Sequence, residues 1–262
     1  MFRTFEISEP RFEWAGLRYV TVKSAALKGR GDITLWVPTG AVPVGMVLLL
    51  HGVYGSHWAW ALKGGAHRTA DRMVASGEIP PMVVAMPSDG LWGDGSGYWT
   101  HPAQDFERWM VEEVPAAVIQ AVPALSEGAP RFIAGLSMGG YGALRLACRY
   151  PERFAAASGH SSITRFEQLA LFVEEPLEAY GPGEGPRDVL EVALANRHRL
   201  PPLRFDCGTE DVLIEANREL HRALESAGVP HVYEEFPGGH AWPYWETHLA
   251  ETLRFFGRTA RG

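Results

Sequence analysis

A serine lies at the centre of residues 135–139, which read G-L-S-M-G and join an apolar run to a helical pattern. The run at 132–134 is typical of a buried strand, and the spacing of apolar residues at 141–147 predicts a helix. Such a sharp turn strains the backbone of Ser137, and the glycines on either side leave room for it. The pattern predicts an α/β fold that presents the Ser137 hydroxyl to an incoming carbonyl group.

Strand and helix patterns alternate along most of the chain. We expect strands at 17–23, 33–37, 46–50, 82–86, 131–134, 154–158, 203–207 and 232–236, and helices at 66–76, 104–122, 141–150, 188–199, 214–227 and 243–256. Pro115 should kink or split the second helix, because proline lacks a backbone N–H. The first strands follow one another without helices, and the later ones alternate with them. This order predicts a mostly parallel sheet with an antiparallel N-terminal edge and helices on both faces.

The length and composition are those of one globular domain. The 262 residues are 46% hydrophobic and 21% charged, which is enough for one sizeable core. We therefore expect a single α/β domain over residues 1–262. The segment 161–202, with the glycine- and proline-rich stretch 181–186, is too short for a second domain. We interpret it as a small cap over the mouth of the site.

The charge pattern argues against several classes of partner. The net charge is −7, and the basic residues form no cluster, so a nucleic-acid partner is not expected. No stretch approaches the roughly 20 apolar residues of a membrane span, and the N-terminus lacks the apolar core of a signal peptide. We therefore expect a cytoplasmic protein. The two cysteines have no zinc or disulfide spacing, and no other motif indicates a metal or a cofactor.

The residues after the last two strands could complete the chemistry of Ser137. Asp211 follows the strand at 203–207 and could accept a hydrogen bond from a histidine, although Glu210 and Asp206 are alternatives and a surface turn would also explain an acidic residue here. His240 follows the strand at 232–236 and is the candidate general base. The order Ser137, Asp211, His240 is that of α/β-hydrolases.

An oxyanion hole requires two backbone N–H groups near the serine. Met138 begins the helix after Ser137, where the helix dipole is positive. Val53 lies in the loop after the strand at 46–50, and Gly52 would let that loop turn closely, although a simple β-turn would give the same pattern. We expect the amides of Val53 and Met138 to bind the oxyanion.

The chain is rich in aromatic residues near these loops, which suggests an aromatic pocket, although ordinary core packing would explain each ring equally well. The candidates for its lining are Tyr54, Trp60, Tyr98, Trp99, Phe166 and Trp242.

Four separated segments together resemble the putative esterase family of the α/β-hydrolases, which includes tributyrin-type carboxylesterases, S-formylglutathione hydrolases and the antigen 85 mycolyltransferases. These segments are LLHG at 49–52, AGLSMGGYGA at 134–143, CGTED at 207–211 and PGGH at 237–240. The resemblance implies Ser137 as nucleophile, Asp211 as acid and His240 as base. Ala241 departs from the pattern, since relatives often carry a polar residue there.

The expected activity is that of a serine carboxylesterase acting on a small-molecule ester with a short acyl chain, through an acyl-enzyme and without a cofactor. An acyltransferase or thioesterase with the same three residues is the main alternative. A peptidase, or a non-catalytic binding protein on a hydrolase scaffold, would be a more distant one. The sequence indicates no oligomeric state.

Overall fold

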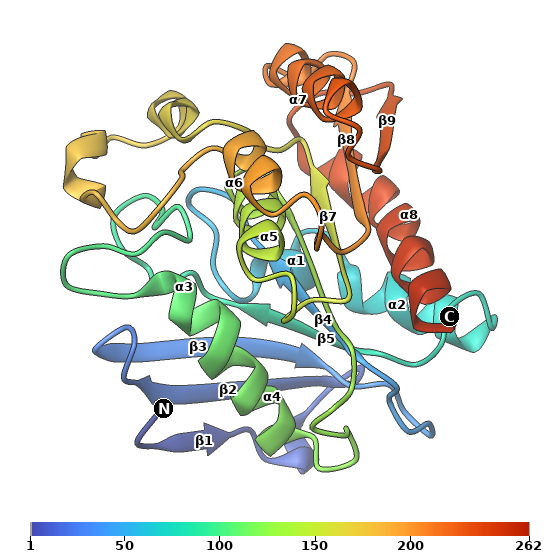
Figure 1. Ribbon diagram of the computed structural model, residues 1–262. Coiled ribbons are helices and arrows are strands. Elements are labelled where there is room, and N and C mark those ends of the chain that lie inside the picture. The colour runs from blue at the N-terminus through green and yellow to red at the C-terminus, as the bar shows by residue number, and fades with distance from the viewer. Residues whose placement is uncertain (1, 262) are drawn as a thin grey trace.

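The computed structural model describes residues 2–261. A nine-stranded sheet runs through the middle of the molecule (Figure 1). The strand order is β1-β2-β3-β5-β4-β6-β7-β8-β9. The strands are β1 Phe5–Ile7, β2 Leu17–Ser24, β3 Gly29–Trp36, β4 Met46–Leu50, β5 Val83–Pro87, β6 Arg131–Leu136, β7 Ala156–His160, β8 Leu203–Gly208 and β9 Val232–Phe236.

The sheet has a parallel part and an antiparallel edge. Strands β5, β4, β6, β7, β8 and β9 run parallel to one another. Strands β1, β2 and β3 pair antiparallel, and β3 also pairs antiparallel with β5, which joins the two parts. The expected fold is therefore confirmed, with β1 as an additional short strand at the edge. The parallel strands β4 to β8 are buried at every position except Arg131 at the start of β6, which agrees with their largely apolar runs.

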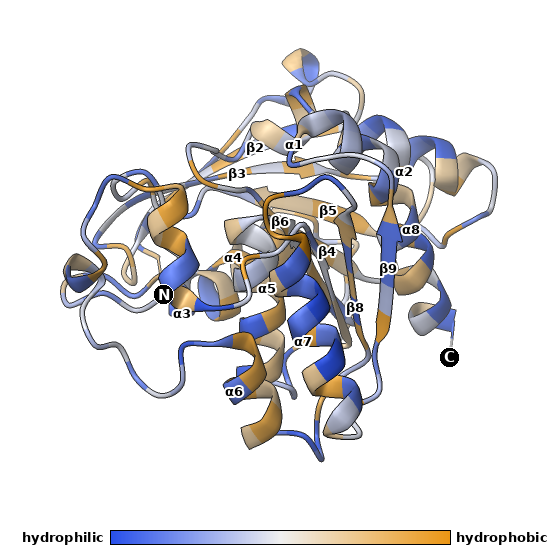
Figure 2. Ribbon diagram, turned by 90° about the horizontal axis from the view of Figure 1, so that it is seen from above, coloured by the Kyte–Doolittle hydropathy of each residue, from blue (hydrophilic) through white to orange (hydrophobic). Residues whose placement is uncertain are grey.

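Helices cover both faces of this sheet (Figure 2). The α-helices are α1 Ala59–Leu62, α2 Ala66–Ala75, α3 Phe106–Arg108, α4 Val114–Ala121, α5 Met138–Arg149, α6 Val189–Ala195, α7 Ile214–Ser226 and α8 Trp242–Arg261. Helices α1, α2 and α8 bury their apolar side chains in one core cluster, and α4 to α7 bury theirs in the other. Each face of the sheet thus has its own core.

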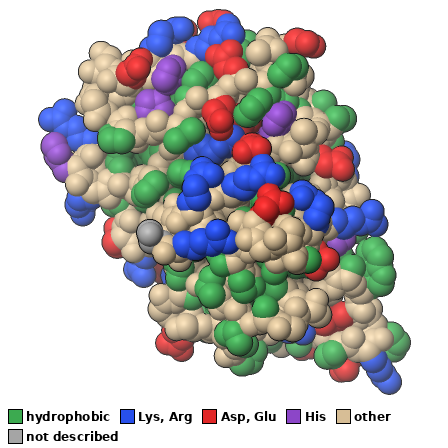
Figure 3. Space-filling view, turned by 90° about the vertical axis from the view of Figure 1, so that its right-hand side faces the viewer, with side chains coloured by type: hydrophobic (Ala, Val, Ile, Leu, Met, Phe, Trp, Pro, Cys, Tyr) green, Lys and Arg blue, Asp and Glu red, His purple; other side chains and the backbone are tan. Residues whose placement is uncertain are grey.

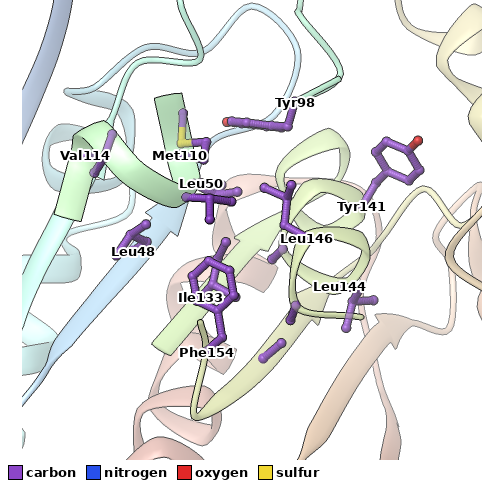
Figure 4. Packing of buried hydrophobic residues seen from close by; sticks show 14 of the residues in the cluster. Leu48, Leu50, Tyr98, Met110, Val114, Ile133, Tyr141, Leu144, Leu146 and Phe154 are labelled. Carbon is purple, nitrogen blue, oxygen red and sulfur yellow. The ribbon is translucent and has the colours of Figure 1, made fainter. Parts of the chain in front are cut away.

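The larger core packs α4 and α5 against the strands (Figure 4). Leu48 and Leu50 of β4 and Ile133 of β6 lie beneath Met110 and Val114. All five side chains are fully buried. At roughly 25 cal/mol per Å² of apolar surface, burying each such side chain contributes about 1.5–3 kcal/mol, so this cluster strongly favours the fold.

The helix expected at 104–122 is divided, as the proline predicts. A π-helical turn, η2 at Trp109–Glu113, joins α3 to α4, and Pro115 lies in the first turn of α4. Because Pro115 has no N–H to donate to the preceding turn, the wider π turn before it accommodates the ring.

The topology creates a crevice at the carboxyl ends of β4 and β6. From β4 the chain crosses to β5 on one side, and from β5 it returns to β6 on the other side of β4. Ligands of open α/β sheets bind at such a switch point, because the two loops diverge there. The loop after β4 carries Val53, and the loop after β6 carries Ser137.

The segment 161–202 forms two short 3-10 helices, η3 Phe166–Leu171 and η4 Leu177–Tyr180, and then α6. Glu175 accepts hydrogen bonds from the Asp94 N–H at 3.1 and 3.2 Å, and the Tyr180 hydroxyl donates to the Gly95 carbonyl at 2.8 Å. The segment is therefore anchored on the loop at 89–99.

The face on which α8 and β9 lie carries charges of both signs (Figure 3). On α8, Arg254 pairs with Glu251 at 2.6 Å and with Glu78 at 2.9 Å. This face is therefore not a uniformly basic surface. Within residues 2–261, no helix has both the length and the apolar character needed to cross a membrane.

Candidate active site

Ser137 occupies a strained position between β6 and α5. Its backbone has φ +53° and ψ −118°, a region that residues with side chains rarely adopt. The Ser137 N–H donates to the carbonyl of His160 at 2.9 Å, and the Ser137 carbonyl accepts from the Tyr141 N–H at 3.0 Å. The turn is thus held from both sides, and the serine is presented at the carboxyl edge of the sheet.

The two glycines beside this turn are required by close backbone contacts. A Cβ atom on Gly139 would lie 2.4 Å from the carbonyl oxygen of Leu50, and one on Gly135 would lie 2.4 Å from the carbonyl carbon of Gly139. Backbone atoms cannot move away as a flexible side chain can. The glycine spacing is therefore explained by the packing of β6 and α5 against the end of β4.

Ser137, His240 and Asp211 form one chain of hydrogen bonds. His240 Nε2 lies 3.0 Å from Ser137 Oγ, and His240 Nδ1 lies 3.0 Å from each carboxylate oxygen of Asp211. The Asp211 side chain is fully buried, whereas His240 is 19% exposed. An imidazole held in this way by a carboxylate can take a proton from the serine as it attacks a carbonyl.

The acidic member of this chain is Asp211 rather than its neighbours. Burial alone would raise the pKa of Asp211, but hydrogen bonds and charge interaction with His240 and a hydrogen bond from the Leu213 N–H bring that pKa below its usual range. Glu210 is exposed, and Asp206 hydrogen-bonds His160 instead. Of the three carboxylates considered from the sequence, only Asp211 reaches His240.

The two expected oxyanion donors both border the serine. Met138 is the first residue of α5, so its N–H has no carbonyl partner within the helix. Val53 lines the same cavity as Ser137. A Cβ on Gly52 would lie 2.8 Å from Leu136 Cδ1 and 3.3 Å from Ser137 Cβ, so a side chain here would crowd the residues at the end of β6. The role of these two amides remains a prediction.

His51 holds this loop in place, which sequence reasoning missed. Its Nδ1 lies 2.7 Å from the Gly52 carbonyl, and its Nε2 lies 3.0 Å from the Asp89 N–H. The Tyr98 hydroxyl donates to the His51 carbonyl at 2.9 Å. Since the Asp89 N–H must donate, Nε2 is the acceptor and Nδ1 carries the proton. The His-Gly pair after a buried strand was the available signal.

A cavity of about 470 Å³ opens above Ser137. Tyr54 and Trp242 line it, as expected from the sequence. The other four expected pocket residues, Trp60, Tyr98, Trp99 and Phe166, do not line it and are no more than 1% exposed.

These four rings do not reach the cavity because they have partners in the core. The Trp60 indole donates to the Leu50 carbonyl at 2.8 Å, and Tyr98 supports His51 as described above. Trp99 and Phe166 pack against each other with their ring centroids 5.9 Å apart.

Several residues other than the six candidates also line the cavity. They are Trp58, Ala59, Lys63, Leu136, Phe172 and Trp245, together with glycines of the loop after β4 and Ala241 beside the histidine. Phe172 belongs to the segment 161–202, so this segment does reach the site. Its signal was the apolar composition of 166–172.

A second buried polar network lies behind the serine. His160 Nδ1 lies 2.9 Å from an Asp206 carboxylate oxygen, and its Nε2 lies 2.9 Å from the Thr252 hydroxyl. Arg204 pairs with Asp206 at 2.5 Å and with Glu234 at 2.7 Å. Since the His160 carbonyl accepts from the Ser137 N–H, this network supports the end of β7 on which the nucleophile turn rests.

Within residues 2–261, no group of three or more His, Cys, Asp or Glu side chains is placed to hold a metal ion.

The sheet topology and the nucleophile turn define an α/β-hydrolase. The putative esterase family matches residues 24–256, and the chain belongs to this family. An acetyl esterase of Caldicellulosiruptor saccharolyticus is 26% identical over 231 residues, which cover 81% of this chain and 83% of that protein. The relationship expected from the four motifs is thereby confirmed.

Two solved structures resemble the whole chain. A ferulic acid esterase superposes with a TM-score of 0.80 at 25% identity, over 97% of this chain and 98% of that one. An S-formylglutathione hydrolase from Agrobacterium tumefaciens has the same fold, with a TM-score of 0.79 at 21% identity over 95% and 97% of the two chains. The family and the acetyl esterase relative show that the protein is a carboxylic ester hydrolase.

Proposed function

We propose that the protein is a serine carboxylesterase that hydrolyses short-chain acyl esters through an acyl-enzyme on Ser137. The observation that carries the proposal is the continuous hydrogen-bonded path from Ser137 Oγ through His240 to the buried carboxylate of Asp211. This path supports the roles of Ser137 as nucleophile, His240 as base and Asp211 as orienting acid, which is the arrangement that acyl transfer uses.

In the first half of the reaction, His240 Nε2 takes the hydroxyl proton as Ser137 Oγ bonds to the ester carbonyl carbon. The carbonyl oxygen becomes an oxyanion, which the Val53 and Met138 amides stabilise. His240 then gives its proton to the leaving alcohol as the ester C–O bond breaks. In the second half, water loses a proton to His240 and attacks the acyl-enzyme, which releases the acid and restores Ser137.

The size of the cavity supports a small substrate. Its volume of about 470 Å³ is near the lower end of ligand pockets, roughly 300–1,000 Å³, and aromatic side chains form much of its wall. Trp58, Phe172 and Trp242 would pack against the apolar part of an ester. The relative named as an acetyl esterase supports the same conclusion.

The experiment is a comparison of Ser137→Ala with Ser126→Ala on p-nitrophenyl acetate and butyrate. Ser126 is an exposed serine outside the cavity lining, so its variant controls for the loss of a hydroxyl group. We expect Ser137→Ala to lower kcat/KM by at least about a thousandfold and to abolish labelling by a fluorophosphonate probe, while circular dichroism stays unchanged. Wild-type rates in this variant would refute the proposal.

The product distinguishes an esterase from an acyltransferase or thioesterase with the same residues. We expect the acyl group to appear as the free acid, even when alcohols or thiols are added in competition with water.

A further inference from the structure

Lys63 is a charged residue in a cavity wall that otherwise consists of aromatic, aliphatic and glycine residues beside Ser137 and His240. No aspartate or glutamate of residues 2–261 lines this cavity. The chain as a whole has a net charge of −7 and contains only three lysines. A lysine at this position therefore gives the cavity a local charge opposite to that of the protein.

The ammonium group is directed at a wall of the cavity. Lys63 Nζ lies 5.4 Å from the ring centroid of Trp242, within the range of a cation–π contact. Trp242 is itself held edge-on by Trp60 at 5.6 Å and by Trp245 at 5.4 Å. The Lys63 backbone caps α1 through a 2.9 Å hydrogen bond from its N–H to the Ala59 carbonyl. These contacts fix both ends of the Lys63 side chain near the cavity.

No carboxylate neutralises this charge. Among residues 2–261, none forms an ion pair with Lys63, whereas buried arginines such as Arg145 and Arg204 pair with Glu107 and Asp206 at 2.7 and 2.5 Å. The Lys63 ammonium is therefore free to pair with a ligand.

Acidic groups lie instead near the Tyr54 part of the wall. Tyr54 hydrogen-bonds Asp94, and Asp94, Glu174 and Glu175 raise the pKa of its phenol, although none of the three carboxylates lines the cavity. An anion in this cavity is thus attracted toward Lys63 and repelled from the Tyr54 side. The charges would orient a substrate as well as attract it.

We propose that Lys63 is a specificity residue that binds an anionic group of the ester, so that esters with a carboxylate are preferred over neutral esters of similar shape. The inference rests on the proposed esterase function and adds a substrate class to it. Because Lys63 is exposed, the preference is modest and depends on salt.

Two pairs of esters test this preference and locate the anionic group. Each pair consists of an anionic ester and a neutral ester of similar shape. In the first pair, 4-acetoxybenzoate carries the charge on the alcohol part, and its methyl ester is neutral. In the second pair, mono-4-nitrophenyl succinate carries the charge on the acyl part, and 4-nitrophenyl pentanoate is neutral. The measured quantity is the ratio of kcat/KM for the anionic ester to kcat/KM for its neutral partner. General effects on the cavity cancel in this ratio.

Lys63→Met and Lys63→Glu are compared with Lys23→Met, which removes the same charge from an exposed position on β2. For at least one pair, we expect the ratio to fall about threefold in Lys63→Met and about tenfold in Lys63→Glu, and to stay constant in Lys23→Met. Raising the salt from about 0.01 M to about 0.5 M should reduce the wild-type ratio toward that of Lys63→Met.

An unchanged ratio in both Lys63 variants for both pairs would overturn the proposal, as would an equal fall in Lys23→Met. Neither result would affect the proposed esterase function, because both are measured on an active enzyme. Failure of the wild-type protein to hydrolyse any of the four esters would instead count against the esterase function itself.

Discussion

The ring of Phe172 stacks on the imidazole of His240, with the ring centroids 5.2 Å apart and the planes inclined by 21°. Trp245 meets the same imidazole edge-on, at 5.1 Å and 89°. The candidate base is therefore held from two directions, by α8 and by the segment 161–202. This contact couples the segment to the position of His240 Nε2 relative to Ser137 Oγ.

Replacing Phe172 should reduce activity through this contact. We expect Phe172→Ala to lower kcat/KM for p-nitrophenyl butyrate about three- to tenfold, since an aromatic pair is worth roughly 0.5–1.5 kcal/mol beyond its buried area. Phe172→Leu, which keeps an apolar group beside the imidazole, should lose less. Leu171→Ala is the control, because the neighbouring Leu171 is 65% exposed. An equal loss in the Leu171 variant would show that the segment acts only through its general packing.

Removal of the Asp211 charge should impair the reaction without removing the nucleophile. Asp211→Asn cannot accept from His240 Nδ1–H as a carboxylate does, so the wrong tautomer is favoured and kcat should fall by about 10³–10⁴-fold. Glu210→Gln removes an adjacent, exposed carboxylate and should retain activity. Steady-state kinetics of both variants on p-nitrophenyl acetate make the comparison. Similar losses in the two variants would mean that Asp211 has no specific role.

The sequence predicted the fold where local pattern and burial agree. Strand β4 was predicted at its observed bounds, Met46–Leu50, because an apolar run that short between turns is typical of a parallel strand covered on both faces. The hydrogen-bonded contact of Ser137, His240 and Asp211 could be predicted from their order in the sequence, because each of them lies in the loop or turn after a parallel strand. The three-residue strand β1 and the four-residue helix α1 were not predicted, since so few residues show no periodicity.

The lining of the cavity could not be predicted in the same way. Trp60 and Trp58 are two residues apart, yet Trp60 is 1% exposed and Trp58 is 41% exposed and lines the cavity. The two residues differ because the Trp60 indole donates a hydrogen bond to the Leu50 carbonyl. This hydrogen bond can form only when α1 packs against the end of β4. Phe172 reaches His240 because the segment 161–202 is anchored on a distant loop. Both facts depend on tertiary contacts that local sequence does not encode.

Asp206 should make the stability of the protein depend on acid pH. Burial alone would raise the pKa of Asp206, but its interactions with His160 and Arg204 bring the pKa down to about 2, below the ordinary value of 3.8. A carboxyl whose pKa is lower in the folded state stabilises the fold above its ordinary pKa. This stabilisation, about 2 kcal/mol for Asp206, is lost as the pH falls from 3.8 toward 2.

Urea unfolding of the wild type and of Asp206→Asn from pH 6 to pH 2.5 measures this contribution. At pH 6, Asp206→Asn should be about 3–5 kcal/mol less stable, because it leaves a buried arginine with one carboxylate partner fewer. The difference in free energy of unfolding should narrow below pH 3.8, as the wild-type carboxyl becomes protonated. Asp71→Asn, an exposed change on α2, should stay within about 0.5 kcal/mol of the wild type. A difference between wild type and Asp206→Asn that is constant with pH would contradict the assigned pKa, because the network would then stabilise the fold without its charge.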